Sequence, residues 1–229
     1  MPARRTPVSP LNLLLSCEHG GNKVPKKYAP LFRGADAALC SHRGYDPGAL
    51  KLARHLAKNF GAPLIYEEVT RLLIEMNRTL RSPTLFSEFT KELPEAEKKE
   101  LIARYHAPYR ARILETLKTP ALHFSVHSFT PVFNGVRRTL DIGLLYDPGR
   151  SLEKRIAKQL KEHLSPRFTV RMNQPYKGIA DGLTKELRRK FPDTLYAGIE
   201  LEVNQSIVSD IEVLRALEKA LKEVILGQY

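Results

Sequence analysis

The chain has 229 residues, of which 42% are hydrophobic and 27% are charged. These are ordinary values for a globular protein, so bulk disorder is excluded, and the length suits one domain with a substantial core. Its 37 Lys and Arg against 25 Asp and Glu give a formal net charge of +12, which attracts anions such as nucleic acid or acidic small molecules.

The basic residues do not form the pattern of a nucleic-acid-binding protein. They are scattered, mostly on segments that also carry Glu, such as Lys91–Arg112 and Leu152–His163, and no RNA-binding aromatic signature or helix-turn-helix spacing accompanies them. No apolar stretch reaches the length of a membrane span. The two cysteines, Cys17 and Cys40, suit a reducing compartment better than a disulfide scaffold. We therefore expect a cytoplasmic protein with neither a membrane nor a nucleic acid as its partner.

Short apolar runs alternate with longer helical patterns along the chain. The expected strands are Asn12–Ser16, Leu64–Glu67, Leu122–His127, Ile142–Tyr146, Phe168–Met172 and Tyr196–Val203. The expected helices are Pro47–Asn59, Glu95–Thr116, Leu152–Leu164, Asp181–Lys190 and Ile207–Leu226. This alternation predicts an α/β layered fold with a largely parallel sheet. We expect a single domain over residues 1–229, with residues 1–10 flexible.

Two of these helices carry further signals. Asp46 and Pro47 are typical of the cap and first residue of a helix, and Gly61 is typical of a helix end. The last helix is expected to pack on the sheet, because apolar residues recur on one of its faces. They are Ile207, Ile211, Leu214, Leu217, Leu221 and Ile225.

Three polar connections rich in Gly, Pro or Asn are predicted loops. They are Gly20–Asp46, Leu73–Phe89 and Asn173–Thr184. Binding and catalytic residues concentrate on loops that a rigid scaffold holds in place. The distinctive residues of these loops are Asp46, Asn77, Arg78 and Tyr176.

Two predicted strands end in a histidine. An apolar run ends at Glu18 and His19, before a Gly-Gly pair, and the strand over residues 122–127 ends at His127. A lone histidine here is more often a polar residue bonded to backbone. Two histidines at matched strand ends instead favour a catalytic metal, which commonly takes two His and a carboxylate and leaves one position for water. We expect a divalent metal, with zinc the first choice.

The third ligand has two candidates. Asp46 lies at a predicted helix N-terminus, where the helix dipole stabilises its charge, although a simple N-cap explains it equally well. Glu18 competes, but successive residues of a strand point to opposite faces, so it can share an ion with His19 only if the chain has already turned. We choose Asp46, with Glu18 as the fallback.

Two carboxylates, spaced two residues apart so that they face the same side, interrupt the last predicted strand. Glu200 and Glu202 lie between apolar neighbours, and a buried carboxylate needs a cation, a wet cleft or a metal. Glu200 is the candidate general base, which would take a proton from water and pass it to a leaving amine. The alternative is an edge strand whose Glu face is simply solvated.

Other residues are candidates for contact with the substrate. Arg78, next to Asn77, offers a planar fork for a carboxylate, and Tyr176 can cover the site and donate to an oxyanion. A solvated Arg and a Tyr packed in a turn are the plain alternatives. A nucleophilic Cys17 is a rival, but on a strand it would lie about 6.5 Å from His19, too far for a hydrogen bond.

Taken together, these residues and their order resemble the N-formylglutamate amidohydrolase family over most of the chain. The motifs that carry the resemblance are Ser16-Cys17-Glu18-His19 with Asn22 and Pro25, His42-Arg43-Gly44-Tyr45-Asp46-Pro47-Gly48-Ala49, Asn77-Arg78, His127-Ser128-Phe129-Thr130-Pro131, Asp141-Ile142-Gly143-Leu144-Leu145, Pro175-Tyr176 and Gly198-Ile199-Glu200. The resemblance implies a three-layer α/β/α hydrolase, similar in plan to the zinc carboxypeptidases, that uses a metal to hydrolyse an N-acyl amino acid.

By the same resemblance, His19 and His127 are expected metal ligands, Asp46 a possible third, and Glu200 the carboxylate that activates water. The chain departs from the family where a Glu-x-Arg-x-Asp pattern is replaced by Glu200-Leu201-Glu202-Val203-Asn204, which puts Glu202 where a substrate-binding Arg is expected. We therefore group Glu202 with the substrate contacts. The resulting hypothesis is a metal-dependent hydrolase of a small anionic N-acyl amino acid or peptide. The alternatives are a basic nucleic-acid or anion-binding protein, or a pseudoenzyme on the same scaffold.

Overall fold

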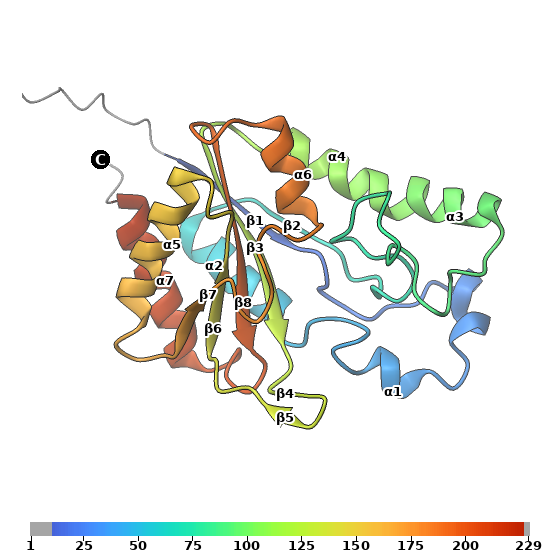
Figure 1. The fold of residues 1–229 in the computed structure, drawn as a ribbon. Coiled ribbons are helices and arrows are strands. Elements are labelled where there is room, and N and C mark those ends of the chain that lie inside the picture. The colour runs from blue at the N-terminus through green and yellow to red at the C-terminus, as the bar shows by residue number, and fades with distance from the viewer. Residues whose placement is uncertain (1–10, 227–229) are drawn as a thin grey trace, which may run out of the picture.

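One mixed sheet of six strands runs through the molecule, in a computed structural model that describes residues 11–226 (Figure 1). From edge to edge its strands are β2 (Leu64–Tyr66), β1 (Asn12–Cys17), β3 (Ala121–Phe129), β8 (Tyr196–Asn204), β6 (Ile142–Leu145) and β7 (Val170–Met172). All neighbouring pairs are parallel except β6 and β8. The carboxyl ends of β1, β3 and β8 therefore meet at one edge of the sheet. The predicted, largely parallel sheet is confirmed.

Helices cover both faces of this sheet and complete a three-layer α/β/α fold (Figure 1). On one face α2 (Ala49–Phe60), α5 (Ser151–Leu164) and α7 (Ile211–Leu226) share an apolar core with the strands. On the other face lie α4 (Ala107–Thr116) and α6 (Leu183–Lys190), with the apolar segment around Leu73 and Met76. A short helix, α3 (Glu95–Leu101), precedes α4. The predicted fold class is confirmed.

The central strand β3 separates polar and apolar side chains by parity. All nine of its residues are buried. Leu122, Phe124 and Val126 belong to the core beneath α2, α5 and α7. Because side chains alternate along a strand, His123 and His127 must face the opposite layer. That layer therefore receives the polar groups of the central strands.

The start of α2 differs from the expected one. Helix α2 begins at Ala49 after Gly48, whose φ of 83° is left-handed, and no side chain caps it. The Asp46 carboxylate instead contacts His19, Arg71 and His127, so the expectation that Asp46 caps the helix is wrong. The predicted end at Gly61 is confirmed, since Gly61 accepts a left-handed φ of 58°.

Two other helices are interrupted or displaced. The predicted helix Glu95–Thr116 is continuous but contains a π-helical turn, Ile102–His106, between α3 and α4. Helix α7 begins four residues later than expected, and Ile211 is exposed at its start. Its buried face still includes Leu214, Leu217 and Leu221, so the predicted packing holds over the rest of the helix.

Small elements of the loops were not expected. They are a 3-10 helix, Lys26–Phe32, the short helix α1 (Asp36–Leu39), and a hairpin of β4 (Val132–Phe133) and β5 (Val136–Arg137). The expectation for residues 1–10 lies outside the described residues. Among the helices of residues 11–226, none is long and apolar enough to cross a membrane.

Candidate active site

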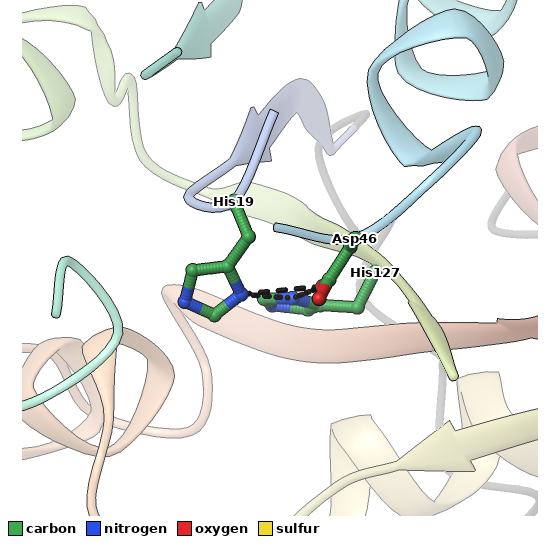
Figure 2. Close-up of side chains that lie close together, drawn as sticks. All are labelled: His19, Asp46 and His127. Carbon is green, nitrogen blue, oxygen red and sulfur yellow. Dashed lines mark hydrogen bonds and ion pairs between the residues drawn. The ribbon is translucent and has the colours of Figure 1, made fainter. Parts of the chain in front are cut away.

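Three side chains from separate segments converge at the carboxyl edge of the sheet (Figure 2). His19 follows β1, His127 lies near the end of β3, and Asp46 precedes α2. Nδ1 of His19 lies 3.2 Å from Nδ1 of His127 and 3.2 Å from Oδ2 of Asp46, and the third side of this triangle is 2.9 Å. All three residues are buried. The structure therefore brings together the three residues that the sequence suggested as metal ligands.

The far side of each imidazole ring is held by a carboxylate. Nε2 of His19 donates to Glu75, and Nε2 of His127 lies 3.1 Å from Oε2 of Glu18 and 2.8 Å from Oγ of Ser125. Carboxylates accept hydrogen bonds, so with a metal ion on the Nδ1 side, where Asp46 also lies, each neutral ring would carry its proton on Nε2 and present a lone pair at Nδ1. Such carboxylate–histidine pairs commonly fix the ring orientation of metal ligands.

The ligand triangle fits a small divalent cation. Ligand atoms bound tetrahedrally to zinc at about 2.0–2.1 Å lie about 3.3 Å apart, close to the observed separations. Three electron-rich atoms at such distances repel one another unless positive charge lies between them. Burial alone would lower the pKa of His127, but its contacts with Asp46 and Glu18 raise that pKa well above its usual value. The site thus favours positive charge, which a metal ion can supply in place of the proton.

Arg71 balances the acidic groups around this cluster. Its Nη1 lies 2.9 Å from Oδ1 of Asp46, and its Nε lies 2.9 Å from Oε2 of Glu75. Burial would raise the pKa of Asp46, but His19 and Arg71 outweigh this effect and hold that pKa well below its usual value. Asp46 is therefore an anion at neutral pH, with one oxygen for Arg71 and the other directed at the two imidazoles.

Glu18, the fallback ligand, lies elsewhere around His127. It is fully buried, and its oxygens accept hydrogen bonds from Tyr109, at 2.6 Å, and from Ser125. Its contact is with Nε2 of His127, whereas the triangle is formed by Nδ1. Glu18 thus lies on the far side of the His127 ring from the triangle. Cys17 lies in the core of the opposite face, and burial raises the pKa of its thiol, which disfavours a nucleophilic role.

Glu202 lies directly beside the three converging residues. On β8 it is paired in register with His127 on one side and with Gly143 of β6 on the other. It is buried, and its Oε2 has no hydrogen-bond partner among the described residues. Burial, together with Asp46 and Glu200, raises the pKa of Glu202 to about 7, although His127 acts in the opposite direction. A carboxyl group with these properties can both accept and donate a proton.

Glu200 lies two residues before Glu202 on β8, further from His127. It is paired in register with Ser125 rather than with His127, and its Oε1 accepts a 2.5 Å hydrogen bond from Thr184 of α6. Both glutamates line the same pocket, so each can meet a substrate. The assignment of the general base to Glu200 stays a prediction, and the geometry favours Glu202.

Asn77 and Arg78 lie in the same pocket and are firmly anchored. Oδ1 of Asn77 accepts the backbone N–H of Leu183 at 2.8 Å. Nη1 of Arg78 donates to the carbonyls of Asn77 and Asp181, and its Nε donates to Thr84. Among residues 11–226, no hydrogen bond reaches Nδ2 of Asn77 or Nη2 of Arg78. These two donors remain available for a ligand.

The pocket has a volume of about 450 Å³, which suits a small molecule. Tyr176 is 46% exposed and lines it, and the guanidinium of Arg138 lies 5.7 Å from the Tyr176 ring. His42 also lines the pocket, next to Phe133 of the hairpin. His123, by contrast, lies buried away from this cluster. Its two ring nitrogens form hydrogen bonds with Ser16 and Tyr196, as expected of a histidine in the core.

Arg71 and Glu75 are site residues that the sequence interpretation missed. Both lie at the edge of the predicted loop Leu73–Phe89, where Glu75 interrupts the apolar run Leu72–Met76. Glu75 is 8% exposed, although charged residues are rarely buried without a partner. A single Glu inside an apolar run, four residues after an Arg, was the available signal.

A family model for N-formylglutamate amidohydrolase matches residues 11–209. The chain belongs to the N-formylglutamate amidohydrolase family. It is therefore an amidohydrolase, as the sequence resemblance implied. No similar sequence is found among curated proteins.

Solved structures share the fold of this amidohydrolase. A gene product of Agrobacterium tumefaciens is 30% identical, with a TM-score of 0.79 over 96% of this chain and 91% of that one. The N-formylglutamate amidohydrolase of Ralstonia eutropha is 18% identical, with a TM-score of 0.65 over 95% and 92%. A bacteriophage poly-γ-glutamate hydrolase is 12% identical, with a TM-score of 0.51 over 99% and 86%. The last two show a likeness of fold alone.

We expect Glu75→Gln to weaken metal binding by the amidohydrolase about 10- to 100-fold, because the charge that orients His19 is lost. Competition with a chromogenic chelator measures this affinity. Glu68→Gln is a matched control, because the Glu68 carboxylate forms an ion pair with the exposed Lys23 and with no other cation among residues 11–226. Equal affinities for the wild type and Glu75→Gln would contradict a supporting role for Glu75.

Proposed function

We propose that this amidohydrolase is metal-dependent and cleaves the amide bond of a small anionic N-acyl amino acid or peptide. The observation that carries the proposal is the triangle of acceptor atoms from His19, Asp46 and His127, which opens into a pocket of small-molecule size. His19, Asp46 and His127 would hold the ion, and zinc is the metal that best suits two imidazoles and a carboxylate. The free thiols of Cys17 and Cys40 support an action in the cytoplasm.

His19, Asp46 and His127 would hold a divalent ion here, which would supply a Lewis acid for an acyl carbonyl and for a water molecule. The chain's own contribution to the chemistry is proton transfer. Glu202 has an oxygen without a partner and lies beside His127 in the sheet. It would accept the proton of the attacking water and deliver it to the nitrogen of the leaving amine.

Substrate binding is assigned to the free donors of the pocket. Nη2 of Arg78 and Nδ2 of Asn77 would hold the carboxylate of the amino acid, in the planar geometry that a guanidinium favours. The carbonyl of Arg78 accepts hydrogen bonds from His106 at 2.8 Å and from Arg110 at 3.0 Å, which fix the backbone at this point. Tyr176, at the mouth of the pocket, would cover the bound substrate and donate to a developing oxyanion.

Metal removal tests this proposal. We expect the purified protein to contain about one equivalent of zinc, and a chelator to abolish amine release from N-acyl amino acids. Activity should return when zinc is added back. Elemental analysis and an amine-release assay on a panel of N-formyl and N-acetyl amino acids provide the measurements.

Two outcomes of that assay contradict the proposal. Amine release that persists after complete removal of the metal would refute metal dependence. A metal-free protein that releases no amine, but binds DNA with a steep dependence on salt, would favour the basic binding protein instead.

A further inference from the structure

Lys177 is a cation of the pocket that the proposed reaction does not use. Among the described residues, three Lys or Arg side chains line this pocket, namely Arg71, Arg78 and Lys177. Arg71 is paired with Asp46 and Glu75. Arg78 is assigned to the carboxylate of the substrate. The Lys177 ammonium has neither an ion pair nor a hydrogen bond to any of residues 11–226, so it is available for a further anionic group of a ligand.

The backbone of the loop that carries Lys177 is fixed on both sides of this residue. Gly178 lies against the backbone of Tyr146, so closely that a Cβ atom would come within 2.2 Å of the Tyr146 nitrogen. The carbonyl of Gly178 accepts a hydrogen bond from Arg188, and the carbonyl of Lys177 accepts the N–H of Ala180 at 2.9 Å. A loop that is ordered before binding loses less entropy when its side chain holds a ligand.

The same loop also contacts the residue assigned to the substrate carboxylate. Nη1 of Arg78 donates to the carbonyl of Asp181 at 3.2 Å, a short distance along the chain from Lys177. Both Arg78 and Lys177 line one pocket of about 450 Å³. The two cations can therefore contact two anionic groups of one small molecule.

Further positive charge lies beside Lys177. The guanidinium of Arg138 lies 5.7 Å from the ring of the preceding residue, Tyr176. Arg138, like Lys177, forms no ion pair with an acidic residue in the part of the chain that the structure describes. Burial lowers the pKa of His42, another residue of the pocket, and the charge of Arg138 lowers it further. Positive potential in this part of the pocket favours an anionic group of the ligand over a neutral one.

We propose that Lys177 is a specificity-determining residue, whose ammonium binds an acidic side chain on the amino-acid part of the substrate. This inference rests on the proposed function and narrows it. Asn77 and Arg78 hold the α-carboxylate, and Lys177 holds the carboxylate of the side chain. The charge-assisted hydrogen bond adds affinity for an acidic substrate, whereas a neutral side chain leaves the ammonium without a charged partner.

Kinetics with two substrates of equal size test this role. Nα-formyl-glutamate and Nα-formyl-glutamine differ in the charge of the side chain and hardly in its shape. We expect the wild type to prefer glutamate in kcat/KM by about tenfold or more, which corresponds to one charge-assisted contact. Lys177→Met should reduce this ratio to about one through a rise in KM for glutamate, and Lys177→Arg, which keeps the charge, should retain most of it.

The matched control is Lys222→Met, which removes the same charge from the exposed surface of α7 and should leave the ratio intact. Lys177 is itself exposed, so its replacement should not disturb the fold. An equal loss with both substrates in Lys177→Met would overturn the inference, because it would mean that Lys177 supports the reaction or the loop. A wild-type ratio in Lys177→Met, or a wild type that prefers glutamine, would overturn it as well.

Binding of free glutamate and free glutamine, measured by calorimetry, separates this inference from the proposed function. The inference predicts that the wild type binds glutamate more tightly than glutamine, and that Lys177→Met loses this difference. Glutamate selectivity without turnover of any N-acyl amino acid would refute the proposed function but support the role of Lys177. Turnover without glutamate selectivity would support the function and refute the inference.

Discussion

His127→Ala should remove the metal and lower kcat/KM for amide hydrolysis by roughly three orders of magnitude or more. His127 supplies one of the three converging acceptor atoms, and its ring links the triangle to the buried carboxylate of Glu18. Alanine leaves two ligand atoms, too few for a catalytic site. Metal content by elemental analysis and amine release, measured on the same preparation, would both fall.

Folding must be controlled in this experiment, because the buried charges of Glu18 and Asp46 lose a partner. His127→Gln is the second variant, since its amide can still bond to Glu18 or Ser125 while binding zinc poorly. His163→Ala, on the exposed surface of α5, serves as the matched histidine control and should keep both metal and activity. A folded His127→Ala protein with stoichiometric zinc and full activity would refute the proposed metal site.

The sequence predicts the sheet well because its signal is local. Six apolar runs of strand length appear in the structure as β1, β2, β3, β6, β7 and β8, with ends that differ by one or two residues. The positions of His19 and His127 follow from the same pattern, since parallel neighbours deliver their carboxyl ends to one edge. The reversed direction of β6 and β7, which depends on the path of the chain, has no signal in the local sequence.

Contacts between distant segments were harder to predict. The carboxylate of Asp46 has the sequence context of a helix cap, and its turn toward His19 and Arg71 depends on tertiary contacts. Glu75 lies 56 positions from His19 in the chain, and the hydrogen bond between them has no periodicity that a sequence could display. Supporting residues of this kind follow from the packing of loops on the sheet.

The two glutamates of β8 show most clearly what could not be predicted from the sequence alone. Glu200 and Glu202 have the same parity, so alternation alone places both on the polar face of the sheet. Their depth relative to the cluster is set by the register with β3, which pairs Glu202 with His127 and Glu200 with Ser125. This register, absent from the sequence, is what moves the proposed general base from Glu200 to Glu202.

Glu202→Gln is expected to lower kcat about 10²- to 10⁴-fold, because the amide can neither accept the proton of the attacking water nor pass it to the leaving nitrogen. The change preserves side-chain size in a buried position, so the fold and the metal content should be retained. KM should change little, since the substrate carboxylate is assigned to Asn77 and Arg78. Steady-state kinetics with the best substrate of the N-formyl and N-acetyl amino-acid panel, together with elemental analysis, measure these quantities.

Glu200→Gln is the matched partner of this variant, and the pair shows which glutamate of β8 is the general base. Glu202→Gln should be nearly inactive, and Glu200→Gln should lose much less activity. Proton transfer is needed for every substrate, so the variant that lacks it should be inactive with each N-acyl amino acid tested. The reverse result, an inactive Glu200→Gln and an active Glu202→Gln, would return the general base to Glu200.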